Sequence, residues 1–190
     1  MVSKSMEESR LENVPIEIQL NIVYHLPDIA SLYTLVHASS RYHTTYLPAR
    51  GFVLSQVLAR ELGPYALFDA GKTAEALTLP KKHEDDGEQL RHFLNKYKDS
   101  VPHYYTTDKV DKLQLDFLVL MAQLQSTVRF VAQGFLGSAL SHRSVKNKII
   151  DEPKPISHRE LERIYRAFYR FEFFLPSLPS APLCTFATIC

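Results

Sequence analysis

Histidine is the side chain most often used for acid–base catalysis and metal binding, so we consider the histidines first. The chain has eight of them, at His25, His37, His43, His83, His92, His103, His142 and His158. None belongs to an HExxH motif, and the spacing of His37 and His43 fits neither two ligands one helical turn apart nor a zinc finger. The histidines therefore predict no metal site.

The other reactive side chains form no catalytic pattern either. Glu84-Asp-Asp86 lies in the charged stretch Pro80–Gly87, where carboxylates are solvated far more often than paired for catalysis. The sequence has no GxSxG elbow, and Gly134-Phe-Leu-Gly137 falls in a helical pattern, where close helix packing explains the glycines. Cys184 and Cys190 show no ligand spacing and favour a reducing compartment. We therefore expect a protein that is not an enzyme and that holds no cofactor and no metal.

Composition narrows the class of protein further. The chain has 190 residues, with 22 Lys and Arg against 21 Asp and Glu, which gives a net charge of +1. This near-neutral charge disfavours nucleic acid and acidic membrane surfaces as partners, since both attract a basic face. A hydrophobic share of 45% indicates one or two folded domains. The first ten residues have no apolar stretch like that of a signal peptide, so we expect a cytoplasmic or nuclear protein.

Apolar residues recur at helical spacing along the chain, and no strand-like alternation extends beyond a few residues. We therefore predict an all-α fold without internal repeats. The expected helices span about 15–26, 29–38, 48–62, 65–70, 73–79, 88–97, 108 onward and 157–174.

Several helix ends carry recognisable start or stop residues. Pro15 suits a first turn, where its missing N–H costs nothing, and Asp28 and Asp108 are typical N-caps. Gly63-Pro64 is a stop signal. Ser157-His-Arg-Glu160 has the spacing of a capping box.

The helix that follows Asp108 carries a long apolar stripe, which we assign to the core, and we expect a break near Ser126-Thr127. The stripe consists of Leu113, Phe117, Leu120, Met121, Leu124, Val128 and Val131. Polar or proline-containing links are expected at Ser39-Ser40, Pro80–Gly87, Pro102–Thr107 and Asp151–Pro155.

The helix over 15–26 has two apolar stripes instead of one. The first contains Ile18, Ile22 and Leu26, and the second contains Ile16, Leu20, Val23 and Tyr24, with only Gln19 between them. The polar residues Glu17, Asn21 and His25 leave solvent one narrow strip. A surface helix normally has one apolar stripe. Two stripes indicate either a helix central to a larger core or one shared with a partner protein.

The order of residues in this region resembles an F-box over about residues 12–47. Val14-Pro-Ile-Glu17 matches its apolar–Pro–x–Glu start, and Leu26-Pro-Asp28 matches its break between helices. Leu32-Tyr-Thr-Leu35 and Ser39-Ser-Arg-Tyr42 match the second helix and the polar pair before an aromatic residue. The family often has Trp or Phe where this chain has Tyr42. Val57–Gly63 and Arg159–Arg170 are similar to a group of fungal F-box-like proteins.

This resemblance implies a non-catalytic role in ubiquitin-dependent protein degradation. F-box segments bind the Skp adaptor, which connects them to the cullin scaffold of a ubiquitin ligase, while the rest of the chain recruits a protein substrate. The resemblance implies that Pro15 starts the first helix of the segment. It also implies that seven apolar side chains contact the adaptor: Ile18, Leu20, Ile22 and Leu26 from the first helix, and Leu32, Leu35 and Val36 from the second.

Three alternatives stay open at this point. The same side chains could fill an internal core, or the segment could be an F-box-like interaction module without a ligase role. A helix-turn-helix nucleic-acid binder is a third reading, with Pro48–Leu62 as the recognition helix. Its Arg50, Gln56 and Arg60 supply few positive groups for phosphate contacts.

The chain thus divides into four predicted regions. They are a flexible N-terminus (1–10), an F-box-like three-helix segment (11–63), a helical array that recruits the substrate (64–172) and a non-helical, apolar tail (173–190). The tail has no charged side chain, but Pro176, Pro179 and Pro182 argue against a membrane-spanning helix. Its composition differs from everything before it, and it would be an aggregation liability if it were exposed.

Overall fold

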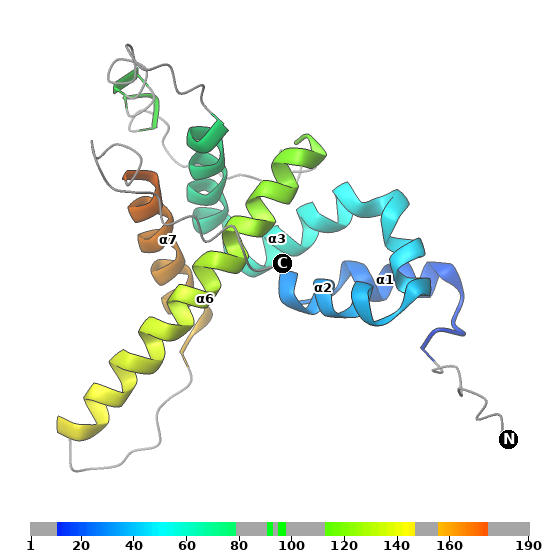
Figure 1. The fold of residues 1–190 in the computed structure, drawn as a ribbon, viewed down its shortest axis with the longest axis horizontal. Coiled ribbons are helices and arrows are strands. Elements are labelled where there is room, and N and C mark those ends of the chain that lie inside the picture. The colour runs from blue at the N-terminus through cyan, green and yellow to red at the C-terminus, as the bar shows by residue number, and fades with distance from the viewer. Residues whose placement is uncertain (1–10, 79–90, 93–94, 98–112, 147–155, 175–190) are drawn as a thin grey trace, which may run out of the picture. The chain divides into compact units, whose positions relative to one another are not determined.

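The structure is a computed structural model that describes residues 11–78, 91–92, 95–97, 113–146 and 156–174 (Figure 1). Every long element in this part of the chain is an α-helix: α1 (Ile16–Tyr24), α2 (Ile29–Ala38), α3 (Ser40–Thr78), α6 (Leu115–Lys146) and α7 (His158–Phe174). The predicted all-α class is confirmed for these residues.

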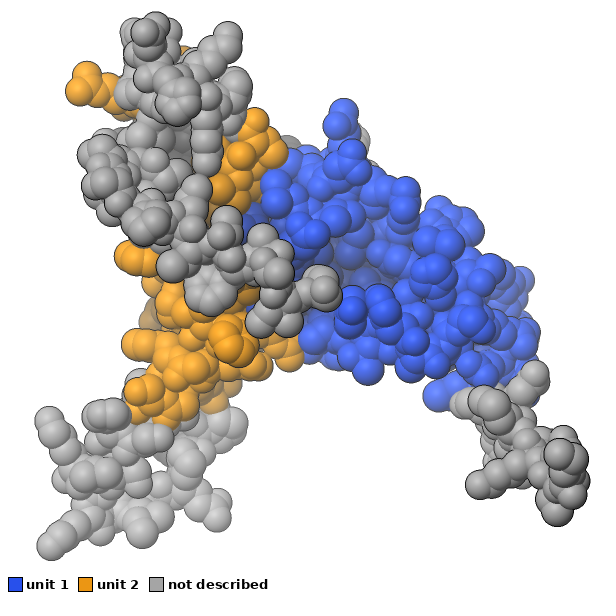
Figure 2. Space-filling model, viewed as in Figure 1, with its two compact units in different colours: residues 1–63, 106–126 blue, residues 64–105, 127–190 orange. Residues whose placement is uncertain are grey.

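The helices form two compact units, which Figure 2 shows in different colours. Unit 1 comprises Met1–Gly63 and Thr106–Ser126, and unit 2 comprises Pro64–Tyr105 and Thr127–Cys190. Both α3 and α6 therefore contribute to each unit. Unit 1 thus contains the first turns of α6, which lie in the predicted region 64–172.

α1 and α2 begin at their expected residues. The carbonyl oxygen of Pro15 accepts hydrogen bonds from the N–H groups of Ile18 and Gln19, both at 3.0 Å. The Asp28 carboxylate accepts a hydrogen bond from the N–H of Ser31 at 2.7 Å, so it caps α2 as predicted. α1 ends at Tyr24, two residues before the predicted end at Leu26.

The predicted link at Ser39-Ser40 and the predicted helix start at Pro48 are wrong. α3 begins at Ser40, and Pro48 lies inside it. Ser39 acts as the cap, because its Oγ accepts from the N–H of Tyr42 at 3.4 Å and its carbonyl from the N–H of His43 at 2.9 Å. A single capping serine therefore replaces the expected loop.

Gly63 separates α3 into two helical parts. Its φ of 70° lies in the left-handed region, which glycine adopts without the steric cost that other residues incur. The next helical part opens with Pro64, and the N–H of Tyr65 donates to Glu162 Oε1 at 3.1 Å. The predicted stop at Gly63-Pro64 is confirmed, but the helices predicted over 65–70 and 73–79 form one helix that ends at Thr78.

α6 is unbroken, so the predicted break at Ser126-Thr127 is wrong. The Ser126 hydroxyl donates to the carbonyl oxygen of Ala122 at 3.0 Å, which satisfies it within the helix. The buried face also differs from the predicted stripe in part. Met121 and Val128 are buried as expected. Leu113, Phe117, Leu120 and Leu124 are only partly buried, and Val131, which was assigned to the core, is exposed. The other buried positions are Leu118, Gln125 and Ala132.

α7 opens with the predicted capping box. The N–H of Glu160 donates to Ser157 Oγ at 3.3 Å, and the N–H and hydroxyl of Ser157 donate to Glu160 Oε2 at 2.9 and 2.7 Å. These bonds lower the pKa of the Glu160 carboxyl from its ordinary value of 4.5.

Several predictions fall on residues that the structure does not describe. They are the flexible N-terminus at 1–10, the loops at 80–87 and 102–107, the cap at Asp108, the linker at 151–155 and residues 175–190 of the tail. Of the helix predicted over 88–97, residues 91–92 and 95–97 are described and are helical.

Candidate protein-binding surface

The orientation of α1 is set by a buried glutamine. Gln19 is fully buried beside Val23, and its Nε2 donates to the carbonyl oxygens of Val14 at 2.8 Å and Glu12 at 3.2 Å. Its Oε1 accepts from the Thr45 hydroxyl at 2.9 Å. Because every polar atom of this amide has a partner, Gln19 can occupy the core, and the two apolar stripes of α1 become its flanks.

One flank of α1 is left without a full covering. It consists of Pro15, Ile18, Ile22 and Leu26, and we call it the Ile18 flank. Pro15 is exposed, Ile18 keeps 47% of its surface exposed, and Ile22 and Leu26 are half-buried. Pro15 and three of the seven apolar residues expected to contact an adaptor therefore lie together on one partly exposed apolar strip.

The opposite flank of α1 is used in part inside unit 1, whereas Ile16 at its start keeps 55% of its surface exposed. Leu20 is half-buried there, and the ring of Tyr24 packs edge-to-face on Phe52 of α3 with centroids 5.2 Å apart. Leu20 therefore lies on a different side of the helix from Ile18 and Ile22.

The three predicted adaptor contacts on α2 divide between core and surface. Leu32 and Val36 are buried together with Ile29 in the core, whereas Leu35 is half-buried. The burial of Leu32 and Val36 agrees with the intramolecular alternative for these two residues, because their side chains are not available on the surface.

The turn between α1 and α2 is held by side chains that the sequence did not single out for this purpose. Arg60 Nη1 donates to the carbonyl oxygen of Leu26 at 2.6 Å, and the N–H of Ile29 donates to Glu61 Oε2 at 2.8 Å. Gln125 Nε2 donates to Glu61 Oε1 at 2.7 Å. The adjacent charges Arg60-Glu61 between apolar neighbours were the sequence signal for these contacts. Arg60 contacts this turn, which weakens its assignment to phosphate binding in a helix-turn-helix protein.

The segment before α1 is also anchored to unit 1. The Ser39 hydroxyl donates to the Glu12 carboxylate, and the Tyr42 hydroxyl donates to the carbonyl oxygen of Leu11 at 3.2 Å. Tyr42 is fully buried, so its ring packs in the core while its hydroxyl is hydrogen-bonded to Leu11. The segment 11–15, which ends at Pro15, is therefore held in place by these two hydrogen bonds.

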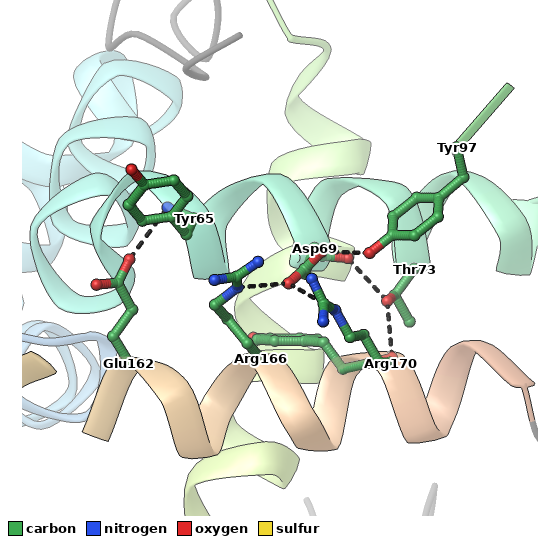
Figure 3. Close-up of polar contacts among 8 residues, drawn as sticks. Tyr65, Asp69, Thr73, Tyr97, Glu162, Arg166 and Arg170 are labelled. Carbon is green, nitrogen blue, oxygen red and sulfur yellow. Dashed lines mark hydrogen bonds and ion pairs between the residues drawn. The ribbon is translucent and has the colours of Figure 1, made fainter. Parts of the chain in front are cut away.

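Unit 2 contains a buried carboxylate cluster that the sequence analysis missed (Figure 3). Asp69 on α3 is buried, and its Oδ2 lies 2.9 Å from Arg166 Nε and 3.4 Å from Arg170 Nε, both on α7. The Tyr97 hydroxyl donates to Asp69 Oδ1 at 2.7 Å. The guanidinium of Arg166 also lies over the ring of Tyr65, 5.1 Å from its centroid.

Both oxygens of Asp69 have partners, so this cluster ties α3 to α7. Burial raises the pKa of the Tyr97 hydroxyl above its ordinary value of 10.0, and the Asp69 carboxylate raises it further. The helical spacing of Arg166 and Arg170 was a sequence signal for such a site, but it did not identify the acidic partner, which is 97 residues away from Arg166.

A metal site and a membrane span are two further features that side chains and helix length can indicate. Within the described residues, no group of three His, Cys, Asp or Glu side chains could hold a metal ion. Leu115–Ser138 of α6 is long and apolar enough to cross a membrane, with a mean hydropathy of 1.2. Core helices of soluble proteins can be equally long and apolar, so length and composition alone do not assign α6 to a membrane.

Comparison of the chain with protein-family models, curated proteins and solved structures gives no match. The F-box resemblance of residues 12–47 therefore stays a prediction, and the partly exposed Ile18 flank is the candidate site for a protein partner.

Proposed function

We propose that this chain is an F-box-like protein without catalysis of its own, in which unit 1 binds the Skp adaptor of a ubiquitin ligase and the rest of the chain recruits a protein substrate. The Ile18 flank carries this proposal. An apolar strip along one helix is the kind of surface that fits against the helices of a partner protein. The rest of unit 1 presents this strip in a defined position.

The hydrogen bonds that hold α1 and the turn after it favour a preformed binding surface. Gln19 determines which side of α1 faces the core, and Arg60 and Glu61 hold the turn that follows the helix. A surface held in its bound conformation loses little conformational entropy when a partner binds. The Ile18 flank can therefore bind as it stands.

The proposal is tested by co-expression of the full chain with the Skp adaptor, followed by size-exclusion chromatography. We expect the wild-type chain to elute as a complex and the double variant Ile18→Asp/Ile22→Asp to elute alone. Each new carboxylate would be buried without a partner in an apolar interface, which costs several kcal/mol, on the order of 3 or more. A loss of about 3 kcal/mol weakens the affinity by more than about a hundredfold.

A matched control uses the polar side of the same helix. Asn21→Asp adds a negative charge to α1 at an exposed position, and this variant should bind as the wild type does. Circular dichroism must show that all three proteins keep their helical content. Absence of a complex with the wild-type chain would overturn the proposal, and so would equal binding by the double variant.

The role in a ligase needs a separate readout. Adding the cullin scaffold to the complex should give a ternary assembly that elutes as one species in size-exclusion chromatography. A stable adaptor complex that never joins the cullin would favour the alternative of an interaction module without a ligase role.

A further inference from the structure

Unit 2 has an apolar surface patch that none of the contacts above uses. It consists of Val131 and Phe135 on α6 and Phe168 and Phe171 on α7, and we call it the phenylalanine patch. The rings of Phe135 and Phe168 pack edge-to-face with centroids 6.1 Å apart. Val131 precedes Phe135 by one helical turn, and Phe171 follows Phe168 by one turn, so the four side chains are neighbours.

Most of the patch is exposed, although its four side chains are large and apolar. Val131, Phe135 and Phe171 keep 40%, 55% and 61% of their surfaces exposed, and Phe168 is half-buried. A contiguous group of large apolar side chains on a surface usually marks an interaction site. The phenylalanine patch is therefore a candidate binding site for an apolar segment.

The segment that follows α7 matches the patch in chemistry. Residues 175–190 carry no charged side chain and contain five large apolar residues: Leu175, Leu178, Leu183, Phe186 and Ile189. Covering the patch with them would bury apolar surface on both sides without desolvating a charge. An apolar segment of this composition is an aggregation liability when it is exposed, and a cover on the patch would remove that liability.

The segment also starts at the patch. α7 ends at Phe174, only three residues after Phe171, and Pro176 cannot continue the helix. A chain of 16 residues reaches at most about 50 Å, which exceeds what is needed to turn back over four neighbouring side chains.

We propose that residues 175–190 bind the phenylalanine patch of their own chain. The tether gives this segment a local concentration in the millimolar range, which a second copy of the protein in dilute solution does not reach. The self-contact therefore prevails over association between chains. This inference concerns unit 2 and does not depend on adaptor binding by unit 1.

The two cysteines of the chain, Cys184 and Cys190, both lie in this segment and allow a direct test. A cysteine is introduced at Val131 in the patch, and disulfide formation is measured under mild oxidation by copper phenanthroline. Each native cysteine is replaced by serine in turn, so that only one partner is present. We expect Val131→Cys to form an intramolecular disulfide with at least one native cysteine.

Phe130→Cys is the matched control. Phe130 is the neighbouring residue on α6 and is 74% exposed, but it lies about 100° around the helix from Val131 and away from Phe135. Non-specific collisions would favour this more exposed position. We expect Val131→Cys to react at least about fivefold faster than Phe130→Cys.

Three results would overturn the inference. They are equal rates at the two positions, no disulfide at Val131, and disulfides that join two chains and become more frequent at higher protein concentration. A stop after Phe174 gives a second readout that needs no introduced cysteine. The shortened chain should bind several-fold more of the apolar dye anilinonaphthalene sulfonate, and the additional substitution Phe135→Ser should reverse the gain. Unchanged dye binding by the shortened chain would also contradict the inference.

Discussion

At the scale of single residues, buried polar side chains determine how the helices are oriented. Gln19 occupies the core of unit 1, and Asp69 occupies the core of unit 2. Each satisfies its hydrogen-bonding groups with partners from other segments, namely Thr45 for Gln19, and Arg166 and Tyr97 for Asp69. A buried polar group with all its partners in place favours one packing arrangement over others, since any shift would leave it unpaired.

Asp69→Asn tests this role in unit 2. The substitution removes the charge that faces Arg166 and Arg170, and an unpaired, partly buried guanidinium is costly. We expect the free energy of unfolding to fall by about 2–3 kcal/mol. Urea denaturation monitored by circular dichroism measures it.

Arg170→Gln is the control for this substitution, because its Nε lies farther from Asp69, at 3.4 Å, and its side chain is half exposed. It should cost no more than about 0.5 kcal/mol. Equal losses for the two variants would mean that the carboxylate of Asp69 does not organise the cluster.

At the scale of elements, helix ends follow local rules except where a single residue changes the outcome. Asp28 and Ser157 cap helices at their expected positions. Ser39 turns an expected link into a cap, which moves the start of α3 eight residues ahead of Pro48. Gly63 divides α3 because its left-handed φ is incompatible with a continuous helix.

Gly63 and Gly51, two of the three glycines of α3, should respond to alanine in opposite directions. Gly63→Ala places a Cβ on a left-handed residue and should destabilise the protein by about 1–2 kcal/mol. Gly51→Ala lies in the helical part, where an added Cβ meets nothing within 4 Å, and should stabilise it by up to about 1 kcal/mol. Thermal unfolding of both variants compares the two signs. A stabilising Gly63→Ala would show that the left-handed turn does not persist in solution.

The capping box of α7 should make the stability of that helix depend on pH. The pKa of the Glu160 carboxyl is lower in the folded protein than its ordinary value of 4.5, so the ionised form is favoured by folding. Its contribution is present above pH 4.5 and is lost as the pH falls through the lowered pKa. Helical content measured between pH 6 and pH 3 should decline less steeply in Ser157→Ala than in the wild type. An identical decline in both proteins would argue against the box.

At the scale of the whole molecule, the chain builds two units with different kinds of core. Unit 1 buries mainly branched aliphatic side chains: Val23, Leu32, Val36, Val53, Val57, Leu58 and Leu62. Unit 2 buries several alanines together with Tyr165 and Tyr169. Small residues let helix backbones approach each other closely, and the Thr73 hydroxyl donates to the carbonyl oxygen of Tyr169 at 3.2 Å. Adaptor binding by the Ile18 flank concerns unit 1, and the contact of residues 175–190 with the phenylalanine patch concerns unit 2. An experiment can therefore contradict one proposal without affecting the other.

The sequence by itself determined the helical class, the caps at Asp28 and Ser157 and the stop at Gly63. These features depend on residues within a few positions of each other, so local rules predict them. It also identified the helix over 15–26 with its two apolar stripes, one of which supplies most of the Ile18 flank.

Only the tertiary structure decided which of the apolar residues are inside. Leu32 and Val36 fill the core while Ile18 remains half exposed, and the hydrophobic pattern alone could not separate them. Gln19, Glu61 and Asp69 are placed by partners 26 to 97 residues away in the chain. Such pairings arise when helices pack, so no periodicity within one helix can reveal them.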